Sequence, residues 1–389
     1  MSNPSSIINR LGMGIPIFGF SHCRDVVVAI SKAGGLGVYG AGLHSDAQIA
    51  IDLRWIEEQL GNLPYGVDLL MPTKYVGSDS GGLSAADARA AIPATITAFL
   101  DDMMVRYAVP PATDDGHPGD DAEFLALGGQ RYSAKQAEGI LDLAFAHKPR
   151  LLVSALGPPP RDVVDRAHAQ GMLVGALAGR VRHALKHVAA GVDLVIAQSY
   201  EAGGHTGEIG GMVLTPLIVD AIAPVPVIAA GGIGDGRQLA AALALGAEGV
   251  WCGSVWLPTA ESDLLPVVKR RLVDAAAEDT LRTRAMTGKP SRLLRTAWVD
   301  EWERPDTPDP LPNPLHAVAI GPYVARIEKA AASPSASPNE GPGALAPTAA
   351  GQVIGLLKAE TSCRQVVSDM LEGCVDSLAR VQSLLEQEA

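Results

Sequence analysis

The chain has 389 residues, of which 47% are hydrophobic and only 4% aromatic, and it carries a formal net charge of −12. This acidic balance excludes a bulk attraction to nucleic acid or to an anionic membrane, and the length allows a large core. The four cysteines have no CxxC spacing, which argues against a zinc site and a disulfide scaffold. Because neither a signal-peptide pattern nor a membrane-spanning apolar run is present in the sequence, we expect a cytoplasmic protein.

Short apolar runs alternate with helical patterns from residue 15 almost to residue 260. Strands separated by helices in this way pair in parallel through right-handed crossovers. Eight such units favour a closed α/β barrel, a (β/α)8 TIM barrel over residues 1–260, rather than an open doubly wound sheet. The expected strands are 15–18, 34–39, 65–70, 150–155, 172–176, 193–197, 225–229 and 249–252.

Two segments do not follow this alternation. Residues 72–131 contain no clean strand, and we interpret them as an insertion after strand 3 that forms either a lid or a solvent-facing excursion. Residues 261–389 are expected to form a C-terminal helical and loop extension that packs on the barrel, with helices that include 264–277 and 279–284. Within it, the low-complexity tract 333–347 predicts a mobile loop. Lys269 to Arg271, with Arg282 and Arg284 beyond, are interpreted as a solvated helix face.

Glycine-rich loops follow the last three expected strands. A catalytic barrel carries its site on the loops after its strands, and a phosphate site after the last two is common. Glycines let backbone N–H groups approach a phosphate, and the helix opened by Asp235 or Gly236 favours an anion at its N-terminus. We therefore predict phosphate binding here. The candidate residues on these loops are Gly203, Gly204, Gly231, Gly232, Gly253 and Ser254, and Trp251 and Cys252 at the end of strand 249–252 are candidates beside them.

His205 is the candidate catalytic residue, because it follows a strand and lies among glycines. An imidazole titrates near neutrality, so it can take or give a proton at working pH. The alternative is a histidine that only hydrogen-bonds a cofactor or a backbone carbonyl. Glu201 is interpreted as orienting the loop. A GxGxxG match at Gly35 to Gly40 overlaps an expected strand, so we reject a Rossmann site, and no metal motif is found in the sequence.

The motifs of these loops are similar to those of a known family. Residues 198–207 resemble the Q-G-x-E-A-G-G-H-x-G motif of the nitronate monooxygenases, formerly called 2-nitropropane dioxygenases. Residues 226–236 resemble their P-V-I-A-A-G-G-I-x-D-G motif, and residues 245–254 resemble L-G-A-x-G-V-x-x-G-T. The three motifs together are specific. The resemblance implies a TIM barrel that contains FMN, in which a nitronate and O2 yield a carbonyl compound and nitrite.

The resemblance also implies roles for individual residues. Gly19, Phe20 and Ser21 would lie along the flavin, Gln198 would contact its ring or ribityl chain, and the glycine loops with Ser254 would hold its phosphate. His205 would be the base near flavin N5. Two positions depart from the family pattern: Asp68 replaces an asparagine expected to contact the flavin, and Ser199 replaces a glycine.

Three functions stay open at this stage. The first is an FMN-dependent nitronate monooxygenase, which uses a small-molecule nitronate and O2. The second is an FMN reductase that acts on an enoyl thioester with NAD(P)H, since such reductases share two of the motifs. The third is a barrel that binds a phosphorylated ligand without redox chemistry. No nucleic acid, membrane or metal is expected as a partner, and a homo-oligomer is left open.

Overall fold

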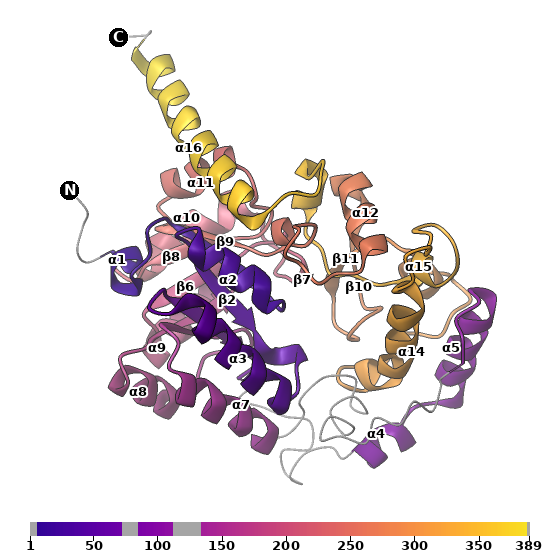
Figure 1. Cartoon of the computed structure of the whole chain (residues 1–389). Helices are drawn as coiled ribbons and strands as arrows, with labels where there is room; N and C mark the ends of the chain where they lie inside the picture. Colours follow the sequence, from indigo (N-terminus) through magenta and orange to yellow (C-terminus); the bar gives the residue numbers. More distant parts are fainter. Residues whose placement is uncertain (1–5, 72–84, 112–133, 387–389) are drawn as a thin grey trace.

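The computed structural model describes residues 6–71, 85–111 and 134–386. Its centre is a closed parallel barrel with the strand order β1-β2-β3-β4-β5-β6-β8-β9 (Figure 1). The predicted TIM barrel is therefore confirmed, and each expected strand lies within three residues of its predicted ends. The strands are β1 (Ile17–Ser21), β2 (Leu36–Gly40), β3 (Tyr65–Leu69), β4 (Leu151–Ser154), β5 (Leu173–Ala178), β6 (Leu194–Gln198), β8 (Val227–Ala230) and β9 (Gly249–Cys252).

Helices connect the strands and cover the outside of the barrel. They start where the sequence supplies caps: the Ser45 side chain accepts from the N–H of Gln48, and that of Asp235 accepts from the N–H of Arg237. The short α1 (Ile7–Leu11) precedes β1. The barrel helices are α2 (Arg24–Lys32), α3 (Asp46–Leu60), α7 (Ala134–His147), α8 (Arg161–Ala169), α9 (Val181–Ala190), α10 (Gly211–Ile222) and α11 (Gly236–Ala244), with the 3-10 turns η1 (Ala41–Leu43) and η3 (Ser254–Trp256).

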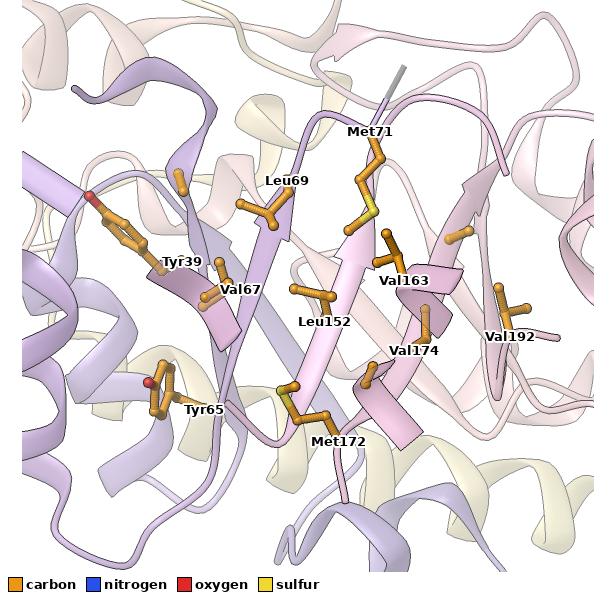
Figure 2. Packing of buried hydrophobic residues seen from close by; sticks show 14 of the residues in the cluster. Tyr39, Tyr65, Val67, Leu69, Met71, Leu152, Val163, Met172, Val174 and Val192 are labelled. Atoms are coloured by element: carbon orange, nitrogen blue, oxygen red, sulfur yellow. The ribbon is translucent and has the colours of Figure 1, made fainter. Parts of the chain in front are cut away.

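Side chains on each strand alternate between the barrel interior and the helix layer. Outward-facing Val67, Leu69 and Leu152 pack against helix residues such as Val163, and Figure 2 shows part of this layer. The inward-facing residues form a separate cluster, which includes Phe18, Val38, Val153, Ile196 and Trp251. The barrel is therefore filled with side chains, and the direction of any residue near a strand end follows from its place in the alternation.

A second core lies beside the barrel. It joins residues of the insertion, such as Leu100 and Met103, with residues of the C-terminal part, such as Leu272 and Trp298. We call this unit, residues 85–111 and 264–357, the cap; in Figure 1 α4 and α5 lie beside α14. Its elements are α4 (Ala85–Ala90), α5 (Ala94–Arg106), α12 (Pro266–Asp274), η4 (Ala277–Asp279), β10 (Thr280–Thr283), β11 (Ser291–Leu294), α13 (Ala297–Trp302), α14 (Leu315–Ala331), α15 (Gly341–Leu345) and η5 (Gln352–Leu356).

One prediction in the C-terminal part is wrong, and another segment is more ordered in secondary structure than its composition indicates. Residues 279–284 were expected to be helical, but Thr280–Thr283 is strand β10, paired antiparallel with β11. The predicted mobile tract 333–347 contains helix α15. There Leu345 is fully buried, and the Arg271 guanidinium donates to the Gly343 carbonyl at 2.5 Å. The residues of the insertion at 72–84 and 112–133 lie outside the described residues.

The last helix, α16 (Cys363–Glu386), returns from the cap to the barrel and packs on α11. The two backbones touch at Gly236, where a Cβ would lie only 2.3 Å from the Cys374 nitrogen. The final turns of α16 extend away from the body of the molecule (Figure 1). Among the described residues, no helix has the length and apolar character needed to cross a membrane.

Candidate functional site

Four predicted residues face the interior of the barrel near the carboxyl ends of its strands. Phe20 and Trp251 pack with the inward cluster, and their ring centroids lie 6.0 Å apart. Asp68 lies between the outward-facing Val67 and Leu69, so its side chain points inward. Gln198 lies two residues after the inward-facing Ile196 on β6, so its side chain points to the same face. Strands β1, β3, β6 and β9 thus each bring one candidate to the same opening. We call this opening, at the carboxyl ends of the barrel strands, the mouth.

Three other candidates face away from the mouth. A Cβ at Gly19 would lie 2.3 Å from the Ile30 side chain and 3.0 Å from that of Trp256, on the outside of the barrel. The Ser21 hydroxyl accepts the N–H of Cys23. Cys252 is buried among outer-layer side chains, and this burial raises the pKa of its thiol. Only the backbones of these three residues are therefore available to a ligand in the mouth.

The ends of the neighbouring strands β8 and β9 carry unused backbone donors. Gly231 and Gly232 have φ values of +104° and +71°, which glycine adopts without strain. Within the described ranges, the N–H groups of Gly231, Gly232, Gly253 and Ser254 have no hydrogen-bond acceptor. Two later N–H groups of the loop after β8 are occupied, since Gly234 donates to the Gln238 side chain and Arg237 donates to that of Asp235. Four free N–H groups on adjacent strand ends suit a phosphate-sized anion.

Ser199 and Glu201 shape the loop that follows β6. Ser199 is fully buried, and its hydroxyl faces the Gly231 carbonyl at 3.5 Å, so this departure from the family pattern packs β6 against the loop after β8. Both carboxylate oxygens of Glu201 accept the N–H of Gly211, the first residue of α10, at 3.1 Å. The prediction that Glu201 orients a loop is confirmed.

His205 lies on the short strand β7 (Gly204–His205), which pairs with β11 of the cap. Its Nε2 lies 2.7 Å from the Thr287 hydroxyl, which also contacts the backbone of Lys289. The tautomer of the ring decides which of the two groups donates in the His205–Thr287 hydrogen bond. The imidazole is solvent-accessible but has protein on most sides. This desolvation, with the charge of Lys289, lowers the pKa of His205, so the ring is a neutral base at neutral pH.

The cap closes directly onto the loop that carries His205. A Cβ at Gly203 would lie 2.8 Å from the Gly351 nitrogen, so glycine is needed for this contact. The Gly351 N–H donates to the Ser254 hydroxyl at 2.8 Å, and the Gln352 N–H donates to the Glu201 carbonyl at 2.9 Å. Gly203 and the Ser254 hydroxyl are thus used to dock the cap, whereas a Cβ at Gly204 would meet nothing within 4 Å.

Arg292 is a site residue that the sequence patterns did not reveal. It is only 2% exposed, and its guanidinium donates to the Tyr200 carbonyl and to the carbonyl and hydroxyl of Thr280. It also lies 4.5 Å from the centre of the Tyr200 ring. Arg292 thereby ties the loop after β6 to the β10–β11 hairpin. Arg282 lies opposite it in the same hairpin and Arg284 follows β10, so neither belongs to the solvated helix face that was predicted.

Other features of the described residues do not compete with this site. One surface hollow of about 300 Å³ lies between α11 and α16, and another of about 280 Å³ lies between α7 and α8; neither reaches the mouth. No group of histidine, cysteine or acidic side chains there could hold a metal ion. The mouth is therefore the strongest candidate for the site.

The fold and the mouth define a class: a parallel α/β barrel with unused backbone N–H groups at the ends of its last two strands and a histidine on the short strand β7, which follows β6. The family model described as nitronate monooxygenase matches residues 7–373. The chain belongs to the nitronate monooxygenase family and is an oxidoreductase, as the motifs predicted.

Individual relatives agree with this assignment. A protein of Mycobacterium tuberculosis whose description names a monooxygenase is 52% identical over 381 residues, 98% of this chain and 99% of its own. A protein of Staphylococcus saprophyticus whose description names a nitronate monooxygenase is 30% identical over 305 residues, 75% of this chain and 78% of its own. The solved structure of a nitroalkane oxidase from Streptomyces ansochromogenes is similar with a TM-score of 0.75 and 25% identity, and covers 95% of this chain and 98% of its own.

Proposed function

We propose that the protein is an FMN-dependent nitronate monooxygenase, which oxidises alkyl nitronates with O2 to a carbonyl compound and nitrite. The observation that carries the proposal is the pairing, at one mouth, of a neutral histidine on β7 with unused N–H groups at the ends of β8 and β9. Membership of the nitronate monooxygenase family supports the choice of reaction.

The mouth fits FMN. The N–H groups of Gly231, Gly232, Gly253 and Ser254 would bind its phosphate, and these donors lack any other acceptor in the described chain. Phe20, Asp68, Gln198 and Trp251 would surround the ring, and the open space at Gly204 allows close approach of a ligand to the backbone. When bound, FMN supplies the electron acceptor that amino-acid side chains lack.

The residues of the chain then position the substrate. The neutral His205 imidazole, held by Thr287, offers a ring nitrogen as an acceptor for a proton or a hydrogen bond. Phe20 and Trp251 form an apolar wall that excludes water. The cap, through Gly351 and Arg292, fixes the loop on which His205 lies.

The experiment is anaerobic mixing of the purified flavin-loaded protein with propionate-3-nitronate and, separately, with NADPH. Loss of the flavin absorbance with the nitronate and none with NADPH is expected. Bleaching by NADPH alone would instead favour the enoyl-thioester reductase. A preparation that is colourless and gains no flavin absorbance on addition of FMN would exclude both redox functions and leave a barrel that binds another phosphorylated ligand.

A further inference from the structure

Asp68 lies on the wall of the mouth that faces the candidate phosphate site. It is on β3, and in the closed barrel β3 is four strands away from β8 in either direction. The unused N–H groups of Gly231 and Gly232 follow β8 directly. A cofactor whose phosphate is bound after β8 and whose ring lies in the mouth therefore extends towards β3.

The Asp68 carboxyl has no hydrogen-bond partner in the described part of the protein. The residue is 6% exposed, and its side chain points inward because Val67 and Leu69 on either side point outward (Figure 2). Neither a side chain nor a backbone group of the described residues bonds to this carboxyl. A buried polar group without a partner is unfavourable. Its oxygen atoms are therefore available to a ligand in the mouth.

The strands that flank Asp68 bring no positive charge to it from the described residues. It is in register with the apolar Val153 on β4 and with Gly40 on β2. The space in front of Gly40 is occupied by the ring of His22, whose Nδ1 lies 2.6 Å from the Gly40 carbonyl. The inward-facing cluster deeper in the barrel is apolar. The titratable neighbour of Asp68 on this wall is therefore the His22 ring.

Burial shifts both titratable groups of this wall towards their neutral forms. It is the main cause that lowers the pKa of His22; His44 acts in the same direction, and the hydrogen bond to Gly40 and the charge of Asp263 act against it. Burial also raises the pKa of Asp68 well above its ordinary value. Because a neutral imidazole does not stabilise a carboxylate by charge, Asp68 keeps its proton to a higher pH than an exposed aspartate does.

A protonated carboxyl has the same hydrogen-bonding pattern as the asparagine of the family motif. Its O–H donates and its C=O accepts, as the NH2 and C=O of an amide do, whereas a carboxylate only accepts. The isoalloxazine ring of FMN has carbonyl oxygens and ring nitrogens that accept hydrogen bonds. An ionised Asp68 would lose its donor and repel an anionic cofactor. Aspartate can thus take the place of the asparagine as long as it is protonated.

We propose that Asp68 binds FMN in its protonated form, with its O–H donating to an acceptor of the flavin ring, so that the affinity for FMN falls as the pH rises. The proposal rests on the FMN-dependent function proposed above. Since FMN stabilises the protonated form, its affinity is constant at low pH and decreases, by up to about tenfold per pH unit, as Asp68 ionises in the free protein. An asparagine at this position gives no such dependence.

The test measures FMN binding rather than turnover. The full-length protein, freed of flavin, is titrated with FMN at pH 6, 7, 8 and 9, and the quenching of flavin fluorescence gives the Kd. Between pH 6 and pH 9 we expect the Kd of the wild type to rise about 10-fold more than that of Asp68→Asn, which shares every other titrating group, including the phosphate of FMN. Asp68→Leu, which has a side chain of similar size without the donor, should bind FMN about 5-fold more weakly than the wild type at pH 6. Asp25→Asn, at an exposed position of α2, is the control and should follow the wild type.

The outcomes separate the two proposals. An equal pH dependence of the Kd in the wild type and Asp68→Asn overturns the role of the protonated acid, and an unchanged Kd in Asp68→Leu overturns the hydrogen bond. A protein that binds FMN with the expected dependence but does not oxidise nitronates leaves the role of Asp68 intact and overturns the proposed monooxygenase. A wild-type protein that binds no FMN at any pH contradicts both. Should thermal unfolding show that Asp68→Leu is not folded, the comparison with Asp68→Asn decides alone.

Discussion

At the scale of single residues, the two departures from the family motifs have different physical reasons. Ser199 is a packing residue, since its buried hydroxyl fills the contact between β6 and Gly231. Asp68 cannot be explained by packing, because an acid without a partner is costly to bury.

The cost of Asp68 gives a stability prediction. Its pKa in the folded protein lies above the ordinary 3.8, so the folded state binds more protons than the unfolded state above that pH, and stability falls as the pH rises from about 4 towards the folded pKa. Asp68→Asn removes this loss and should be the more stable protein at pH 8, by about 1–3 kcal/mol, with the difference shrinking at pH 4. Thermal unfolding of both proteins at three pH values measures it. The exposed Asp25→Asn is the control, and a pH-independent difference for Asp68→Asn would refute the explanation.

His205 gives a prediction on activity. His205→Asn removes the basic nitrogen, so kcat/KM for a nitronate should fall by about 100-fold or more, with FMN still bound because its proposed phosphate donors lie on other loops. In the wild type, activity needs the neutral imidazole and is lost as the pH falls through its pKa. Because that pKa is lowered, the acidic limb should lie below pH 6.5. A limb above this value, or full activity of the variant, would remove His205 from the reaction.

At the scale of elements, prediction from sequence succeeded where local pattern and burial agree. The barrel strands are apolar on both faces, so runs such as Leu194–Gln198 stand out between helices. Strands β10 and β11 have only four residues each and carry Arg282 and Arg292, so no apolar run marks them in the sequence. They form because they pair with each other and because β11 pairs with β7.

The loop between β6 and β7 allows a matched pair of substitutions. In Gly203→Ala the new methyl group would meet the backbone of residues 350 and 351 at 2.8–3.0 Å, so the cap must shift. In Gly204→Ala the methyl group meets nothing within 4 Å, and the cost is confined to a φ of +72°, about 1 kcal/mol. Gly203→Ala should lose more activity at equal or lower stability. Activity and thermal unfolding of both variants measure this, and equal effects would show that cap docking does not matter.

At the scale of the whole molecule, the hydrophobic core of the cap lies apart from the clusters inside and around the barrel. Composition predicted a large core, but it could not show that residues near 100 share one with residues near 300. This packing joins segments that are far apart in the sequence, so the predicted insertion and the predicted C-terminal extension form one unit. The cap then supplies the partner strand for His205.

The shared core can be tested from the insertion side. Leu100→Ala empties a site that is 1% exposed in the cap core, and should lower stability by about 2–5 kcal/mol. Val105→Ala, on the same helix but 79% exposed, should change it by less than about 0.5 kcal/mol. Denaturant unfolding of both variants measures the difference. Equal, small effects would mean that α5 does not contribute to this core.

The route of the chain also sets how the cap is held. The polypeptide leaves the barrel after β3 and re-enters it at α7, then leaves again after β9 and returns through α16. The backbone therefore crosses between barrel and cap four times rather than once. One proteolytic cut cannot release a unit that is attached in this way, and turnover would persist in a protein nicked once between barrel and cap.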